Sequence, residues 1–244
     1  MKNSKIGWTE DTLNPIVGCT KVSEGCANCY AEAMNKRFHW VKDWNKPEFF
    51  PKRLEQLNPK QKPRRIFLCS LSDMFHEDMN LYDDVNPIII KIRECKQHTF
   101  LILTKRSKRM HNFFDWEYLC KEVNIIPNLL LGVTVESDKY LNRIDDLLDT
   151  PAAKRFVSFE PLLSEIIIPD EKLCKLDWAI IGCESGSKRR ECKDEWVESL
   201  INQCEQAEVP VFLKQLMQNG KLIKEPYFNG RQYMQYPESE VKSE

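Results

Sequence analysis

Histidine is scarce in this chain, with four among 244 residues. A metal-dependent hydrolase usually gathers histidines and carboxylates around its metal, so this class of enzyme is disfavoured. The chain also lacks an excess of either charge, since 36 lysines and arginines face 37 aspartates and glutamates. Nucleic-acid-binding domains are usually basic, so bulk electrostatic attraction to nucleic acid is not expected.

Long apolar segments are missing as well. No run approaches the roughly 18 apolar residues of a membrane-spanning helix. Residues 1–5 are followed by a polar stretch and not by the apolar core of a secretory signal. We therefore expect a soluble, cytoplasmic protein without a membrane partner, in which thiols stay reduced. A chain of this length buries a core without disulfide bonds, so its ten cysteines need another explanation.

Three of these cysteines, Cys19, Cys26 and Cys29, lie within eleven residues in the spacing C-x6-C-x2-C. Structural zinc takes four closed ligands, whereas an iron–sulfur cluster held by three thiolates leaves one iron open for a substrate or cofactor. The apolar residues 15–17 precede the cysteines and a helical pattern at 31–38 follows them. We expect a loop between a strand and a helix, where α/β proteins place their chemistry.

Other interpretations of these cysteines stay open. A pair spaced like Cys26 and Cys29 is common as half a zinc site or as a redox pair. A zinc site would need a fourth ligand, for which Cys69, Cys183 and His39 are candidates. The third interpretation is that the thiols bind nothing.

The rest of the chain alternates short apolar runs with amphipathic stretches of helical length. Strands are predicted at 66–69, 99–104, 129–135, 155–159, 178–182 and 209–213. Helices are predicted at 82–97, 107–122, 138–149 and 194–207, the last with Asp194 as its N-cap. Repeated β-then-α units imply a parallel sheet covered by helices. With the first strand and helix, about seven units predict an α/β fold, a partial TIM-like barrel.

The predicted barrel occupies residues 1–217 and carries an aromatic, proline-containing insertion at about 39–63. Residues 218–244 are predicted to form a C-terminal hairpin and a disordered tail. Its strands would be 221–223 and 231–233, because Asn229-Gly230 between them is a turn signal.

Polar or ionisable residues follow the predicted strands at the point where each one ends. They are Ser72 and Asp73, Lys105 and Arg106, Glu136, Glu160, Glu184 and Lys214. Barrel enzymes assemble their active sites at this carboxyl-terminal rim. We therefore expect these side chains to surround the three cysteines.

The succession W-T-E at 8–10, N-P at 14–15, the three cysteines and Y-A-E at 30–32 resembles the start of a phage-associated family of radical-SAM-like proteins. That family has long been catalogued as a domain of unknown function. The likeness continues in order over nearly the whole chain. It includes S-x-S-D-M-F-H at 70–76, L-T-K-R at 103–106, L-G-V-x-x-E at 131–136, S-F-E-P-L at 158–162, G-C-E-S-G at 182–186 and F-L-K-Q at 212–215.

The resemblance implies a barrel of the radical SAM type with a [4Fe–4S] cluster on Cys19, Cys26 and Cys29. Enzymes of this type cleave S-adenosylmethionine reductively and need a reductant, here a flavodoxin- or ferredoxin-like protein. Within this frame, three residues are hypothesised to be catalytic, namely Lys105, Glu136 and Glu160. Five are hypothesised to bind cofactor, namely Ser72, Asp73, Arg106, Gly182 and Glu184. Lys214 would close the rim. His76 would contact the site residues from outside or transfer a proton, but a purely structural histidine is the favoured interpretation.

The substrate is hypothesised to be a nucleotide or nucleic acid, to be modified or repaired. The basic stretches 105–109 and 188–190 would share the barrel mouth with aromatic residues of 39–63 that stack on bases. The alternative is a cluster- or zinc-bearing binding or regulatory protein without radical chemistry. It is favoured by the six-residue first gap, because the usual radical SAM motif is C-x3-C-x2-C. Cys183, where relatives carry glycine, is either incidental or a hydrogen donor to a radical.

Overall fold

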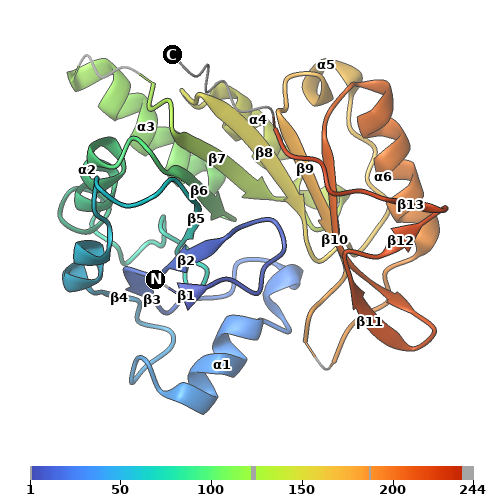
Figure 1. The fold of residues 1–244 in the computed structure, drawn as a ribbon, viewed down its shortest axis with the longest axis horizontal. Helices are drawn as coiled ribbons and strands as arrows, with labels where there is room; N and C mark the ends of the chain where they lie inside the picture. The colour runs from blue at the N-terminus through green and yellow to red at the C-terminus, as the bar shows by residue number, and fades with distance from the viewer. Residues whose placement is uncertain (1, 122–124, 187, 238–244) are drawn as a thin grey trace.

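The structure is a computed structural model that describes residues 2–121, 125–186 and 188–237. Within these residues, a nine-stranded sheet has the order β1-β2-β5-β6-β7-β8-β9-β10-β11. Its parallel strands are β2 (Asp11–Leu13), β5 (Arg65–Leu68), β6 (Thr99–Thr104), β7 (Leu129–Thr134), β8 (Lys154–Phe159), β9 (Trp178–Gly182) and β10 (Val211–Gln218). The edge strands β1 (Lys2–Asn3) and β11 (Lys221–Lys224) are antiparallel to their neighbours. The sheet curls into an open half barrel (Figure 1).

Helices cover one face of this sheet (Figure 1). They are α2 (Asn86–Glu94), α3 (Ser107–Lys121), α4 (Asn142–Asp149), α5 (Asp170–Leu173) and α6 (Asp194–Gln206). A π-helical turn, η3 (Leu81–Val85), leads into α2, and the 3-10 turn η4 (Asp138–Tyr140) precedes α4. The predicted α/β half barrel is therefore confirmed, and the strands and helices predicted between residues 66 and 213 are found near their expected places. The prediction for 107–122 ends at residue 122, which lies outside the described residues.

Alternate residues of each strand pack on opposite faces of the sheet, as the pleat requires. Ile66 and Leu68 of β5 join the large core beneath the helices. Phe67 points to the other face, where the aromatic side chains of Trp8, Trp178 and others form a second cluster. Both faces are thus buried, which explains the near-continuous apolar strands.

The first strand of the sheet differs from the prediction. Residues 11–13 form β2, whereas Ile16–Val17 form β3 and pair with β4 (Glu48–Phe49) in a separate two-stranded sheet. Pro15 lies between the two strands and has no N–H to continue the first ladder. The side chain of Asn14 then accepts hydrogen bonds from the Leu71 N–H (3.0 Å) and the Ser70 hydroxyl (3.1 Å), so the chain turns at this point.

The segment before β5 contains α1 (Tyr30–Phe38), β4 and a 3-10 helix, η2 (Pro51–Gln56). Helix α1 starts directly after Cys29 and is followed by His39, its C-cap residue, which has a left-handed φ of 50°. In Figure 1 this helix lies apart from the layer formed by α2, α3 and α4. The helices of the described residues are all too short or too polar to span a lipid bilayer.

The C-terminal hairpin also differs from the prediction in its partner. The Asn229-Gly230 turn joins β12 (Tyr227–Phe228) to β13 (Arg231–Gln232). Residues 221–224 instead pair with β10 through a second turn, Asn219-Gly220, in which both residues have positive φ. The predicted disordered tail falls mostly at 238–244, outside the described residues. In α6, Lys193 occupies the cap position and Asp194 is the first helical residue.

Candidate functional site

The cysteine loop, defined here as residues 18–29, lies across the carboxyl ends of the parallel strands. Gly18 forms a bridge with Ser72, which follows β5, and accepts a hydrogen bond from its hydroxyl at 2.7 Å. Cys19, Cys26 and Cys29 are all free thiols, and all three are partly exposed. The loop is held at three further points, each by a buried acid that sequence analysis assigned to catalysis or cofactor binding.

The first of these acids is Asp73, after β5. Its carboxylate accepts hydrogen bonds from the Thr104 hydroxyl (2.6 Å) and the backbone N–H groups of Lys105 (3.0 Å) and Phe75 (3.1 Å). It also pairs with the Arg106 guanidinium at 3.2 Å. These donors are all internal to the protein, so Asp73 joins the ends of β5 and β6.

Arg106 carries this network to the cysteine loop. Its Nε donates to Glu77 (2.7 Å), its Nη2 to the Thr20 hydroxyl (2.9 Å), and its Nη1 lies 3.6 Å from the Cys19 sulfur. Burial raises the pKa of Cys19 to about 11, and the negative charge of Asp73 adds to the rise while Arg106 opposes it.

His76 contacts the same Thr20 hydroxyl as Arg106. Its Nε2 lies 2.7 Å from the Thr20 hydroxyl, and its Nδ1 accepts the Asp78 N–H at 3.1 Å. Since Nδ1 is an acceptor, the proton of the neutral ring is on Nε2 and points to Thr20. Burial lowers the pKa of His76 and the nearby Arg106 charge lowers it further, which favours this neutral form.

Glu136, after β7, holds the middle of the loop. It is fully buried and accepts from Arg143 (2.7 Å) and from the Ser23 hydroxyl (2.5 Å), and Lys105 Nζ lies 3.5 Å away. A Cβ on Gly25 would stand 2.4 Å from a Glu136 oxygen. Glycine is therefore required where the loop meets this carboxylate.

Glu184, after β9, holds the end of the loop. It accepts from the Asn28 amide (3.1 Å) and the Arg190 N–H (2.8 Å), and it pairs with the Arg190 guanidinium. Asn28 also donates to the Lys188 carbonyl at 2.8 Å. Burial opposes ionisation of Glu184, but the hydrogen bonds from Arg190 and Asn28 outweigh it and lower the pKa of the carboxyl.

Beside the loop lies a pocket of about 150 Å³. It is lined by Gly25, Cys26, Asn28, Cys29, Tyr30, Lys105, Glu160, Pro161, Cys183, Glu184, Ser185, Lys214 and Gln215. Glu160 pairs with Lys214 at 2.9 Å, and a Cβ on Gly182 would lie 2.8 Å from the same carboxylate oxygen. Cys183 is buried in the wall, and burial raises its pKa to about 11, with a further rise from Glu160.

The family described as Protein of unknown function (DUF5131) matches residues 3–237. The chain belongs to the DUF5131 family. No curated protein and no solved structure matches the chain. The match to the DUF5131 family includes almost the whole half barrel. The chemistry of the protein has to be inferred from the geometry of the site.

The structure brings most predicted site residues of this DUF5131 protein to one rim. Lys105, Glu160, Glu184 and Lys214 line the pocket together with Cys26 and Cys29. The remaining predicted residues lie around the loop or beneath it, namely Ser72, Asp73, Arg106, Glu136 and Gly182.

The basic stretch 105–109 does not face the pocket as a unit. Lys108 lies 4.0 Å from Asp146, and Arg109 donates to the Met79 carbonyl. Only Lys105 lines the pocket.

Sequence reasoning missed several residues that fix the loop. Thr20, Ser23, Gly25 and Asn28 all lie between or beside the cysteines, and that position is a signal that they have a role. Arg143, on α4, is seven residues beyond its partner Glu136 and carries no such signal.

The three thiols of the cysteine loop can be compared with the donor sets of a single metal ion and of a cluster. Among the described residues, no three Cys, His, Asp or Glu side chains are grouped closely enough to hold one metal ion. Cluster thiolates each bind a different iron and need not converge on one point. Cys26 is near enough to Cys19 to raise its pKa, and Cys26 and Cys29 line one pocket. Three free thiols on one anchored loop fit this donor set.

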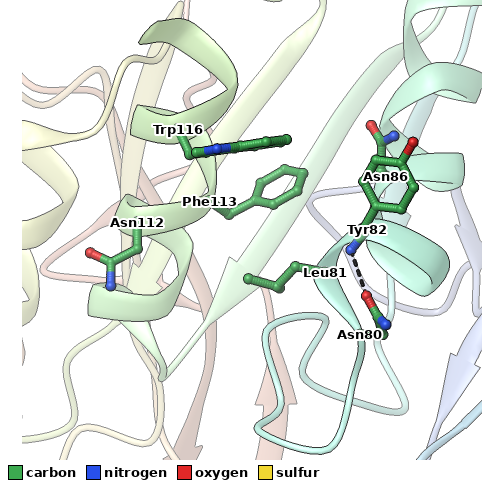
Figure 2. A pocket seen from close by; sticks show the side chains of 7 residues that line it. All are labelled: Asn80, Leu81, Tyr82, Asn86, Asn112, Phe113 and Trp116. Atoms are coloured by element: carbon green, nitrogen blue, oxygen red, sulfur yellow. Dashed lines mark hydrogen bonds between the residues drawn. The ribbon is translucent and has the colours of Figure 1, made fainter. Parts of the chain in front are cut away.

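A second pocket of about 450 Å³ lies away from the cysteine loop. One side of it is formed by η3 and the start of α2, and the other side by α3. Figure 2 shows Trp116 and Phe113 of α3 on one side of this pocket and Tyr82 of η3 on the other, with Leu81 below the ring of Phe113 in this view. None of the site residues predicted from the sequence belongs to it.

Proposed function

We propose that this DUF5131 protein is an iron–sulfur enzyme of the radical SAM type. It holds a [4Fe–4S] cluster through Cys19, Cys26 and Cys29 and cleaves S-adenosylmethionine to modify or repair a substrate. The observation that carries this proposal is the cysteine loop itself: three free thiols, anchored to buried acids at the carboxyl rim of a curled parallel sheet, beside a polar pocket. The family resemblance of the sequence supports the same function.

The acids around the loop then divide into two groups. Asp73, Glu136 and Glu184 direct their oxygens at Arg106, Ser23 and Asn28, and we infer that they position the loop. The ion pair of Glu160 and Lys214 faces the pocket.

The pocket offers charges of both signs to a ligand. Lys105 and Lys214 suit a carboxylate, and Glu160 suits an ammonium group, so a methionyl end with both groups finds partners there. When bound, the cluster supplies the single electron that cleaves the sulfonium. The chain's own contribution is to hold the thiols, orient the methionyl end and surround the reacting atoms with fixed polar groups.

The substrate of the proposed reaction is a nucleotide or nucleic acid. Arg190, held by Glu184 at the pocket, brings the basic stretch 188–190 to the same rim as Lys105. Guanidinium and ammonium groups there suit phosphates. A mobility-shift assay with single- and double-stranded DNA and RNA, with a nucleotide-binding assay beside it, tests this step, and no affinity in either would remove it.

Anaerobic reconstitution, reduction with dithionite and addition of S-adenosylmethionine test the whole proposal. We expect 5′-deoxyadenosine in the wild type and in Cys174→Ala, whose exposed thiol lies outside the loop, and none in Cys26→Ala. A cluster that forms but never releases 5′-deoxyadenosine would favour the second candidate, a cluster-bearing binding or regulatory protein. The unusual six-residue gap between Cys19 and Cys26 supports that candidate.

A further inference from the structure

The three cysteines of the loop have different neighbours. Arg106 Nη1 lies 3.6 Å from the Cys19 sulfur, and the arginine side chain is only 4% exposed. Cys26 has the Ser23 hydroxyl at the same distance. Within the described chain, no arginine or lysine hydrogen-bonds to Cys26 or Cys29. Of the three thiols, Cys19 is therefore the one that has a buried cation, Arg106, beside its sulfur.

The guanidinium cannot easily turn away from Cys19. Its three nitrogens are engaged by Glu77, Asp73 and Thr20 as well as by the sulfur. Thr20 is in turn held by His76. The planar guanidinium is held by contacts at all three nitrogens, so one N–H stays directed at the sulfur. The flexible ammonium group of a lysine would not be held in this way.

We propose that Arg106 is a positioning residue that sets the charge and hydrogen bonding at the Cys19 sulfur and thereby raises the reduction potential of the cluster. This inference rests on the proposed function. Hydrogen bonds to ligand sulfurs and nearby charge are the protein's main means of tuning such potentials. A nearby cation and an N–H donor both stabilise the reduced cluster, because it carries one more negative charge than the oxidised cluster.

Asp73 has the opposite effect in this arrangement. Its carboxylate lies 3.2 Å from the same Nη1 atom, so it brings a negative charge to the same sulfur. Removing Arg106 should make reduction harder, and removing the Asp73 charge should make it easier.

The test is a redox titration of the reconstituted protein, followed by absorbance and electron paramagnetic resonance. For Arg106→Gln we expect at least a tenfold higher ratio of oxidised to reduced cluster at a fixed potential, a shift of about 59 mV to more negative values. Asp73→Asn should shift the midpoint in the positive direction. Arg106→Lys keeps the charge and should give a smaller negative shift, and it replaces Arg106→Gln if that variant binds too little iron. Arg231→Gln, which removes a surface ion pair with Glu205, is the control.

Shifts of opposite sign in Asp73→Asn and the Arg106 variants would support the inference, because loss of structure alone has no reason to reverse sign. Midpoints equal to that of the control, or shifts in the same direction, would overturn it. A wild type without iron and sulfide would instead refute the proposed function, and the iron and sulfide assay made before each titration separates the two failures.

Discussion

At the scale of single residues, the cysteine loop depends on close contacts to buried acids. Glu136 is fully buried, with its oxygens directed at Ser23 and Arg143. Removing one partner of a buried ion pair costs about 3–5 kcal/mol, because the other charge is left without compensation. Loss of any one of these interactions should therefore lower the free energy of unfolding.

Gly25→Ala tests this closeness. The new Cβ would stand 2.4 Å from Glu136, so the loop must move, and we expect a loss of about 1–3 kcal/mol in the free energy of unfolding. Differential scanning calorimetry measures it as a lower Tm. Gly186→Ala is the matched control, because its Cβ would meet only the Asn28 carbonyl at 3.5 Å, an ordinary contact. Equal Tm values for the two variants would contradict the contact.

Thiol reactivity is a second test at this scale. Burial raises the pKa of Cys69 and Cys204 to about 12, whereas Cys174 is exposed. Because the thiolate is the reactive form, iodoacetamide at pH 8 should label Cys174 in the native protein and spare the other two until urea unfolds it. Peptide mass spectrometry gives the order. Labelling of Cys204 as fast as Cys174 would show that the core is packed differently.

The residues of the site were predictable in part. A polar residue after a buried strand is visible in the sequence, and Glu160, Glu184 and Lys105 indeed share one pocket. The sequence does not show which of these groups is satisfied internally. Asp73 and Glu160 both follow a buried strand in the sequence, yet Asp73 is surrounded by backbone and side-chain donors, and Glu160 lines the pocket.

At the scale of elements, a glycine of β7 lies opposite an aromatic residue of β8, whose ring packs on the face of the sheet opposite the helices. A Cβ on Gly132 would lie 2.4–2.6 Å from the ring of Phe156. The ring belongs to the cluster that also contains Trp8 and Trp178. Gly132 therefore gives the aromatic ring the space that it needs between neighbouring strands.

Gly132→Ala should lower the free energy of unfolding by about 1–3 kcal/mol through overpacking. Phe156→Leu removes the ring and costs stability by itself, but in the double variant the alanine should cost much less. Urea titrations of all four proteins give the coupling energy, which contact should make clearly different from zero. Additive losses would mean that the two residues do not touch.

Strands were predicted correctly where they belong to the regular alternation of strands and helices. The strands 99–104 and 178–182 were found with their predicted bounds because apolar runs and flanking polar residues mark both ends. Prediction failed where two segments compete for one partner. Residues 11–13 and 16–17 are both short and partly apolar, and only the proline and the Asn14 contacts decide which one joins the sheet.

At the scale of the whole molecule, the half barrel places the ends of its parallel strands beneath one loop. Repeated β-then-α units predict this arrangement, since the carboxyl ends of parallel strands meet at one edge. They do not predict that β1 and β11 end the sheet as antiparallel edges, because that depends on short segments outside the repeats. The loop crosses the rim because acids after β5, β7 and β9 bind its side chains and Arg106.

The most direct test of the account is the iron and acid-labile sulfide content of the protein after anaerobic reconstitution. We expect about four of each per chain in the wild type and in Cys174→Ala, as for a [4Fe–4S] cluster, and loss of both in Cys19→Ala, Cys26→Ala and Cys29→Ala. One tetrahedral zinc without sulfide in the wild type, or a full complement of iron in a variant that lacks all three thiols, would contradict it.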